Sequence, residues 1–169
     1  MKLEIDKSSY VAKTAVIIGD VVIGKNCGIF PNAVIRGDQN TIEIGDGSNV
    51  QDCCVIHTDR EHKVKIGKNV SLGHGAIVHG AIIEDDCLIG MNTTILNGSK
   101  IGQGSVIGAN ALVKNNMDVP ENSLVLGIPG KIIKQDEKFR ETARLNAEVY
   151  QKLSKEYLRG KHSVYDSKM

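Results

Sequence analysis

Aliphatic side chains recur every six residues along most of this chain, and that period constrains the fold more than any other feature. The repeat runs from Val11 to Ile35, returns after an interruption, slips by one residue at His79-Gly80, and then continues from Ile83 to Val125. A helix brings its apolar face back every three or four residues, so a period of six argues against a helix. It fits a parallel β-helix whose coils have three flat sides of about six residues each.

The composition agrees with a core built from small, regular layers. The 169 residues include 18 glycines, no tryptophan, two Phe and four Tyr, so the aromatic residues on which many cores depend are scarce. Small residues such as Ala15, Cys27 and Ala33 occupy the crowded corner position of the repeat. The pattern resembles the hexapeptide-repeat family, and we predict an all-β solenoid, a left-handed parallel β-helix, over residues 1–134, with roughly six or seven coils.

Two polar stretches, Gln39-Asn40-Thr41 and 59–63, interrupt the period, and we expect both to project as loops from one side. The run from Val125 to Lys131 contains a proline, which cannot donate to a strand ladder, and it closes the solenoid.

The composition changes after the solenoid. Residues 136–159 contain no Gly or Pro, and their apolar side chains recur at helical spacing. These apolar residues are Ala143, Ala147, Tyr150, Leu153, Tyr157 and Leu158. We predict a C-terminal helix over 135–160, capped by Gly160 and packed on the solenoid or on a neighbouring subunit, followed by a loose tail over 161–169.

Charge and hydropathy exclude several classes of partner. The formal net charge is +1, from 21 basic and 20 acidic residues that are well mixed, so no nucleic-acid-binding stripe is present. The charged start of the sequence does not fit a signal peptide, and no stretch approaches the roughly 20 apolar residues that cross a bilayer. We expect a soluble, cytoplasmic protein that contacts neither nucleic acid nor membrane.

The four cysteines, Cys27, Cys53, Cys54 and Cys87, do not have the spacing of a zinc motif, and adjacent cysteines rarely form a disulfide. We interpret Cys27 and Cys87 as small buried residues. Cys53 and Cys54 lie close to His57, so a ligand or redox role stays open for them.

Three of the five histidines, His57, His74 and His79, lie 17 and then five residues apart within the repeat. Along a bent coil, His74 and His79 fall on different sides, so we expect a trimer in which His57 and His79 of one subunit meet His74 of the next. Neutral imidazoles suit Zn²⁺, Fe²⁺ or Co²⁺, and three protein ligands leave a position for water. We therefore predict one divalent metal per chain, with Zn²⁺ as the first choice. His62 fits a loop position and His162 a solvated tail.

Five segments together resemble the motif string of the γ-class carbonic anhydrases, whose fold is a left-handed β-helix trimer with active sites at the subunit interfaces. The segments are Arg36-Gly37-Asp38, Asn49-Val50-Gln51-Asp52, His57, Gly73 to Gly80, and Ile89-Gly90-Met91. The resemblance implies that His57, His74 and His79 are metal ligands and that Gln51 contacts the metal-bound water or the substrate. It also implies that Arg36, Asp38, Asn49 and Asp52 are interface residues around the site, with Arg36 pairing with carboxylates of the adjacent subunit.

The reaction implied by the resemblance is reversible hydration of CO₂ to bicarbonate by a metal-bound hydroxide at the trimer interface. The prototype carries a glutamate just after the Arg-x-Asp element and another on an acidic loop. This chain has Gln39 at the first position and only the short loop Thr58–Lys63 for the second. Glu61 and His62 are the possible substitutes as proton shuttle.

Two other functions stay open on the same scaffold. One is hydrolysis or transfer on an acyl-CoA, by a metal-dependent thioesterase or a hexapeptide acyltransferase. The other is a non-catalytic protein that binds a metal or siderophore or serves as an assembly subunit. A hydratase assay beside a panel of CoA thioesters separates these hypotheses.

Overall fold

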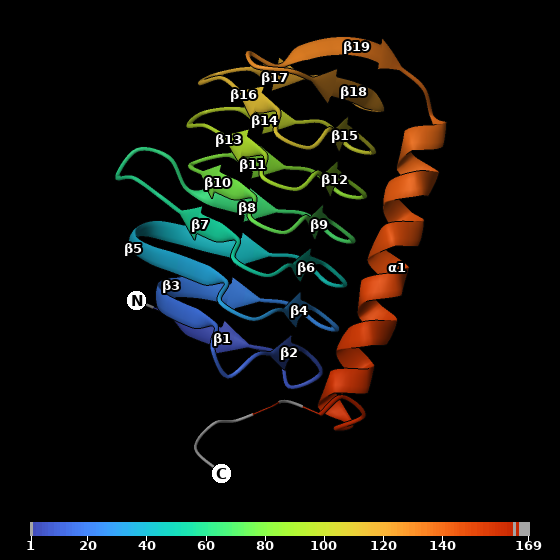
Figure 1. The fold of residues 1–169 in the computed structure, drawn as a ribbon. Helices are drawn as coiled ribbons and strands as arrows, with labels where there is room; N and C mark the ends of the chain where they lie inside the picture. The colour runs from blue at the N-terminus through green and yellow to red at the C-terminus, as the bar shows by residue number, and fades with distance from the viewer. Residues whose placement is uncertain (1, 164, 166–169) are drawn as a thin grey trace.

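The computed structural model describes residues 2–163 and 165, and they form a parallel solenoid with one long helix along its side (Figure 1). Equivalent residues of successive coils pair at intervals of 18, as Leu88 does with Val106 and Val106 with Leu124. Each face therefore takes about one third of a coil, as the six-residue period predicts.

The first face is an eight-stranded sheet with seven parallel strands, one from each coil, and a final antiparallel strand. The parallel strands are β2 (Tyr10–Val11), β4 (Gly28–Ile29), β6 (Asn49–Val50), β9 (Ser71–Leu72), β12 (Leu88–Ile89), β15 (Val106–Ile107) and β18 (Ser123–Leu126). The antiparallel strand is β19 (Lys131–Gln135), which follows the predicted closing run.

The other two faces belong to one 11-stranded sheet, because two long strands run around the corner between them. Those strands are β3 (Val16–Ile23) and β5 (Val34–Ile44). The second face continues with β7 (Val55–His57), β10 (Ile77–His79), β13 (Thr94–Ile95) and β16 (Leu112–Val113). The third face contains β1 (Leu3–Ile5), β8 (Val64–Ile66), β11 (Ile82–Ile83), β14 (Lys100–Ile101) and β17 (Asp118–Val119).

The aliphatic repeat positions form one continuous core inside the coils. From Ile23 to Val125 these side chains are at most 3% exposed, while Val11 and Ile17 in the first coil are partly buried. Cys27 and Cys87 are buried in the same core, as predicted. Burial of one such aliphatic side chain contributes about 1.5–3 kcal/mol to folding.

The prediction of a loop at Gln39-Asn40-Thr41 is wrong. These residues lie inside β5, where the pairing register with β3 shifts between Gly19 and Val21 and accommodates the extra residues. The second interruption is a loop between β7 and β8, as predicted. The two segments are stacked, since the Asn40 amide lies 3.1 Å from the Thr58 hydroxyl and Asn40 Nδ2 lies 3.3 Å from the Arg60 carbonyl.

Helix α1 (Lys138–Leu158) runs back along the first face and contacts β2, β4, β6, β9, β12 and β15 (Figure 1). Ala143 and Ala147 are buried against the solenoid, and four of the scarce aromatic residues gather at this contact: Tyr10, Phe30, Tyr150 and Tyr157. Leu158 is 49% exposed, so its predicted place on the packed stripe is wrong.

The helix ends as its sequence predicts. Gly160 has φ +68°, its amide donates to the Tyr157 carbonyl, and the Lys161 amide donates to the Glu156 carbonyl. This is the Schellman arrangement, in which a residue with positive φ follows the last turn. The predicted loose tail falls largely on residues 164 and 166–169, outside the described residues. In the part of the chain that is described, no helix is long and apolar enough to span a membrane.

Candidate metal centre

His57 and His79 lie side by side on the second face. Strands β7 and β10 pair in parallel with His57 opposite His79, and β5 places Arg36 opposite His57. The two histidines are 22 residues apart rather than 18, because the loop after β7 lengthens that coil. Nδ1 of His57 lies 3.0 Å from Nε2 of His79.

The outer nitrogen of each ring faces an oxygen acceptor. Nε2 of His57 lies 3.0 Å from Oδ1 of Asp38, and Nδ1 of His79 meets Oδ1 of Asn97. A carboxylate and an amide oxygen accept hydrogen bonds, so in a neutral ring the proton lies on the outer nitrogen. The two inner nitrogens therefore present lone pairs to each other.

Two lone pairs that face each other in this way can bind one cation between them. Two nitrogen ligands at about 2.0–2.1 Å from a tetrahedral zinc ion lie about 3.3 Å from each other. The observed 3.0 Å between the inner nitrogens of His57 and His79 is close to that value. Metal-ligating histidines also characteristically donate their second N–H to an oxygen, as both of these rings do. The pair fits two ligands of one divalent ion.

His74 lies elsewhere, at the corner between β9 and β10. Its Nδ1 is 2.8 Å from Oδ2 of Asp52, which lies at the same corner one coil earlier, and its Nε2 is 3.4 Å from the Tyr150 hydroxyl of α1. The ring is half exposed, and with Nδ1 bound to Asp52 its Nε2 faces a hydroxyl that can donate to it. Among the described residues, no three His, Cys, Asp or Glu side chains converge to hold a metal ion. The sharing of ligands between two subunits stays a prediction.

Gln51 and Asn49 form a buried polar chain behind His74. Gln51 is 3% exposed and Asn49 is 1% exposed. Oε1 of Gln51 accepts from the His74 amide at 3.2 Å, and its Nε2 donates to Asn49 Oδ1 at 3.1 Å. Asn49 donates in turn to the Ser71 hydroxyl at 2.8 Å. In this chain Gln51 contacts His74 and makes no hydrogen bond to His57 or His79.

Arg36 and Asp38 lie beside the histidine pair. Nη1 of Arg36 is 2.6 Å from Oδ2 of Asp38, while Oδ1 of that carboxylate faces His57. The Arg36 hydrogen bond holds the pKa of Asp38 below its usual range, and the hydrogen bond with His57 acts in the same direction. Asp38 is therefore an ionised acceptor at neutral pH. Asp52, the other predicted interface carboxylate, is bound to His74 and not to Arg36.

The short loop after His57 is organised by Asp59. Its Oδ1 accepts from the amides of Glu61 and His62 at 2.9 and 2.7 Å and lies 3.0 Å from Nδ1 of His62. Partial burial opposes ionisation of Asp59, but the two amides outweigh it, so the pKa of Asp59 is lowered. His62 is bound to Asp59, whereas Glu61 is exposed.

Of the two cysteines near the site, Cys54 is buried and Cys53 is exposed. Sγ of Cys54 lies 3.1 Å from the Gly73 carbonyl, and burial raises its pKa to about 12. A protonated, buried thiol is a poor ligand and a poor nucleophile. Cys53 has φ +59° at a corner whose equivalents in the neighbouring coils are Asn32 and Gly75.

Three residues at this site were not predicted from the sequence. Asn97 contacts His79 from 18 residues further on, and the coil length of 18 could have revealed it. Asp59 binds Asn97 through Oδ2 and lies only two residues after His57. Tyr150 reaches His74 from 76 residues away on α1, and nothing in the repeat predicts that contact.

An apolar groove of about 420 Å³ runs between α1 and the first face, beside His74 and Gln51. Met91 and Tyr150 line it, and so does Asn146, whose Oδ1 is buried and lacks a hydrogen-bond partner among the described residues. The groove thus combines apolar walls with few polar atoms, as is typical of sites for small molecules.

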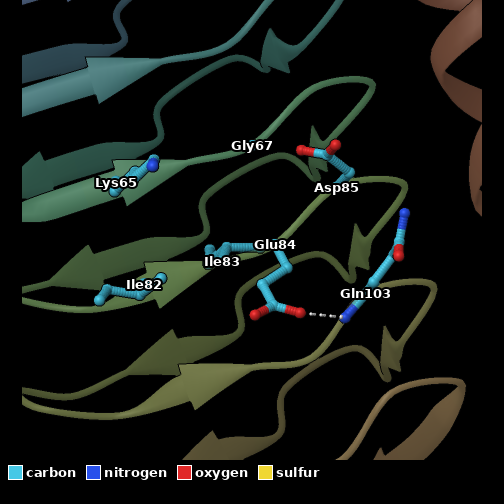
Figure 2. A pocket seen from close by; sticks show the side chains of 7 residues that line it. All are labelled: Lys65, Gly67, Ile82, Ile83, Glu84, Asp85 and Gln103. Carbon is cyan, nitrogen blue, oxygen red and sulfur yellow. Dashed lines mark hydrogen bonds between the residues drawn. The ribbon is translucent and has the colours of Figure 1, made fainter.

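A second hollow, of about 270 Å³, lies on the third face (Figure 2). Glu84 accepts from the Gln103 amide at 3.0 Å and pairs with Lys100 at 2.9 Å, so its charge is already satisfied. Figure 2 shows Lys65 and Ile82 on adjacent strands of this wall. The residues that line this hollow include no histidine or cysteine. We therefore interpret the hollow as a result of how the strands stack and not as a binding site.

Comparison with known proteins defines the class first. The family model described as "Bacterial transferase hexapeptide (six repeats)" matches residues 80–115. A crystal structure of a hexapeptide transferase family protein from Anaplasma phagocytophilum superposes with a TM-score of 0.87 at 34% identity, covering 91% of this chain and 92% of that one. The left-handed β-helix with a C-terminal helix, predicted from the sequence, is confirmed.

The relatives then define the family. A probable carbonic anhydrase of Methanocaldococcus jannaschii is 52% identical over 151 residues, which cover 89% of this chain and 95% of that protein. Gamma carbonic anhydrase 1, mitochondrial, of Arabidopsis thaliana is 36% identical over 78% of this chain, which spans half the length of that relative. The chain belongs to the γ-class carbonic anhydrase-like family of hexapeptide-repeat proteins, and it is a carbonic anhydrase-like enzyme.

Proposed function

We propose that this protein catalyses the reversible hydration of CO₂ to bicarbonate at a divalent metal held between the subunits of a homotrimer. The observation that carries the proposal is the pair of inward-facing nitrogens of His57 and His79, 3.0 Å apart, with both outer nitrogens on oxygen acceptors. His74 of the neighbouring subunit is the third ligand. Its Nδ1 is bound to Asp52, so its Nε2, which faces the Tyr150 hydroxyl in this chain, is the nitrogen that would bind the metal.

When bound, the metal would supply Lewis acidity, which would lower the pKa of water to about 7 and so provide a nucleophile near neutral pH. Three neutral imidazoles suit Zn²⁺, Fe²⁺ and Co²⁺ alike, and Zn²⁺ is the first choice. The protein's own contribution is to hold the rings in one tautomer. Asp38 does this for His57 and Asp52 for His74.

The groove beside His74 suits the substrate. CO₂ is small and carries no net charge, and walls formed by Met91 and neighbouring aliphatic residues admit it without the loss of a hydrogen bond. Gln51 lines this groove and holds the His74 turn, so we propose that it orients the attacking water or the substrate.

Protons must leave the site after each turnover. Glu61 is exposed and His62 is about one-third exposed, and Asp59 connects His62 through Asn97 to His79. We propose Glu61 and His62 as proton carriers at the rim. Because the loop is short and His62 is bound to Asp59, proton transfer to buffer is expected to limit the rate.

The test is reconstitution without air with Zn²⁺, Fe²⁺ or Co²⁺, followed by measurement of metal per chain, particle mass and CO₂ hydration. We expect a trimer with about one metal per chain. His74→Ala should lose the metal, while the exposed His162, which pairs with Glu156, provides a matched control in His162→Ala. Normal metal content in His74→Ala, or a monomer, would overturn the proposal.

A second candidate is metal-dependent hydrolysis of an acyl-CoA thioester. The groove beside His74 favours it, because apolar walls could hold a short acyl chain, and a solved relative is described as a hexapeptide transferase family protein. CoA thioesters assayed beside CO₂ distinguish the two. Full metal occupancy with turnover of neither substrate would instead favour a non-catalytic metal-binding or assembly role.

A further inference from the structure

The three histidines differ in what holds their outer nitrogen. His57 and His74 each face a carboxylate, from Asp38 and Asp52, but His79 faces the side-chain amide of Asn97. An amide has an oxygen that accepts and a nitrogen that donates, so it can hold either tautomer of a histidine, depending on which way it is turned. Something else must therefore set the orientation of Asn97.

Asp59 sets that orientation. Nδ2 of Asn97 donates to Oδ2 of Asp59, and an ionised carboxylate can only accept. Because the amide nitrogen of Asn97 donates to Asp59, the amide oxygen must face His79. The ring of His79 then carries its proton on Nδ1 and leaves Nε2 free to face His57.

Asp59 is itself held in place from the other side. Its Oδ1 accepts from the backbone amides of Glu61 and His62 and lies 3.0 Å from the His62 ring. The short loop is thereby folded around this carboxylate. These contacts fix the position of the carboxylate, so that its other oxygen, Oδ2, faces Asn97.

Gly80 provides room for this arrangement. It has φ +56°, and a Cβ at that position would lie 2.7 Å from Cβ of His62 and 3.2 Å from Oδ1 of Asn97. Any side chain at this corner would push the loop and the amide away from each other. The lack of a side chain at residue 80 therefore allows the loop to approach Asn97.

We propose that Asn97 and Asp59 are positioning residues for His79, and that the short loop 58–63 fixes the tautomer of this histidine from the corner of the solenoid. The significance of that tautomer for metal binding depends on the proposed function, but the tautomer itself does not. Neither residue touches the reacting atoms.

The experiment uses two measurements on the full chain with Asn97→Ala. The first is the ¹⁵N and ¹H NMR pattern of the His79 ring in metal-free protein at about pH 8. We expect the proton on Nδ1 in the parent protein and a shift toward Nε2–H in Asn97→Ala. The second is Zn²⁺ affinity by chelator competition, expected to weaken about 10–100-fold.

Two further variants separate positioning from general destabilisation. Asn115 occupies the same corner position one coil later and is exposed, so Asn115→Ala should change neither the tautomer nor the affinity. Asn97→Asp offers only acceptor oxygens to His79, so it should retain Nδ1–H even though its charge repels Asp59 and lowers stability.

The proposal is overturned if His79 of the parent protein carries its proton on Nε2. It is also overturned if Asn97→Ala leaves both the tautomer and the affinity within twofold of the parent protein. If the parent protein binds no metal but the tautomers behave as expected, the proposed function fails and the positioning role of Asn97 and Asp59 is supported.

Discussion

Mixed trimers offer the sharpest test of where the metal site lies. His57 and His79 are neighbours within one chain, whereas His74 contacts Asp52 and Tyr150 instead. If the site joins the pair of one subunit to His74 of the next, two inactive variants should complement each other. His57→Ala lacks a complete pair but keeps His74, and His74→Ala keeps the pair.

The recovered fraction follows from the threefold symmetry of the proposed trimer. In a random mixture of equal amounts, an interface is intact only when the subunit that provides the pair is His74→Ala and its neighbour is His57→Ala. Each condition holds with a probability of one half, so about one quarter of the interfaces regain all three ligands. Each variant alone has none.

The assay is co-refolding of the two variants at equal concentration, followed by gel filtration, metal analysis and CO₂ hydration. We expect about a quarter of the parent metal content and activity in the mixture. A mixture of His57→Ala and His79→Ala is the matched control, because neither subunit then carries an intact pair. It should recover nothing.

The reasoning is refuted if the first mixture recovers no metal although mass analysis shows that mixed trimers have formed. It is equally refuted if His74→Ala alone retains the parent metal content, since the site would then lie within one chain.

Three further predictions test local features of the same structure. Cys53→Asn should stabilise the protein by about 1 kcal/mol in urea unfolding, because Cys53 has φ +59° and asparagine tolerates that conformation better; an unchanged or lower midpoint would contradict this. At pH 8 a chromogenic disulfide reagent should titrate about one thiol per native chain, since Cys53 is exposed and burial raises the pKa of Cys54 to about 12; rapid reaction of three or four would contradict the burial. Finally, the Arg36 hydrogen bond lowers the pKa of Asp38 in the folded protein. The ionised carboxylate should therefore stabilise the fold fully above about 3.9, the pKa of an aspartate in the unfolded chain, and this stabilisation should be lost as the pH falls through the lower pKa of the folded state. The stability difference between the parent protein and Asp38→Asn should therefore shrink as the pH falls below about 4, and a difference that does not change between about pH 5 and about pH 3 would count against the pairing.

The sequence determined the solenoid because each of its coils repeats one local pattern. The aliphatic position of every repeat points inward and the small residue fits the corner, so a period of six in the sequence becomes a period of 18 in the strand ladder. Gly160 predicted the end of the helix for a similarly local reason, since only the residue after the last turn needs a positive φ.

Predictions failed where the outcome depended on pairing between segments. Gln39-Asn40-Thr41 are polar and break the period, yet they stay in β5 because β3 provides a partner strand with a shifted register. Leu158 has helical spacing, yet it remains 49% exposed, while its neighbour Tyr157 stacks on Tyr10 of the solenoid.

The candidate site divides in the same way. The sequence by itself singled out His57, His74 and His79 as candidate ligands, because an aliphatic repeat does not need imidazoles in order to fold. The sequence also predicted that His57 and His79 of one subunit come together, but only the tertiary structure shows how they meet, because the extra residues of the loop bring positions 22 apart into register. The tertiary structure also decided which oxygens contact the rings. Asn97 reaches His79 from another coil, and Tyr150 reaches His74 from the helix. Contacts at such separations follow from how the coils and the helix pack and not from any local pattern.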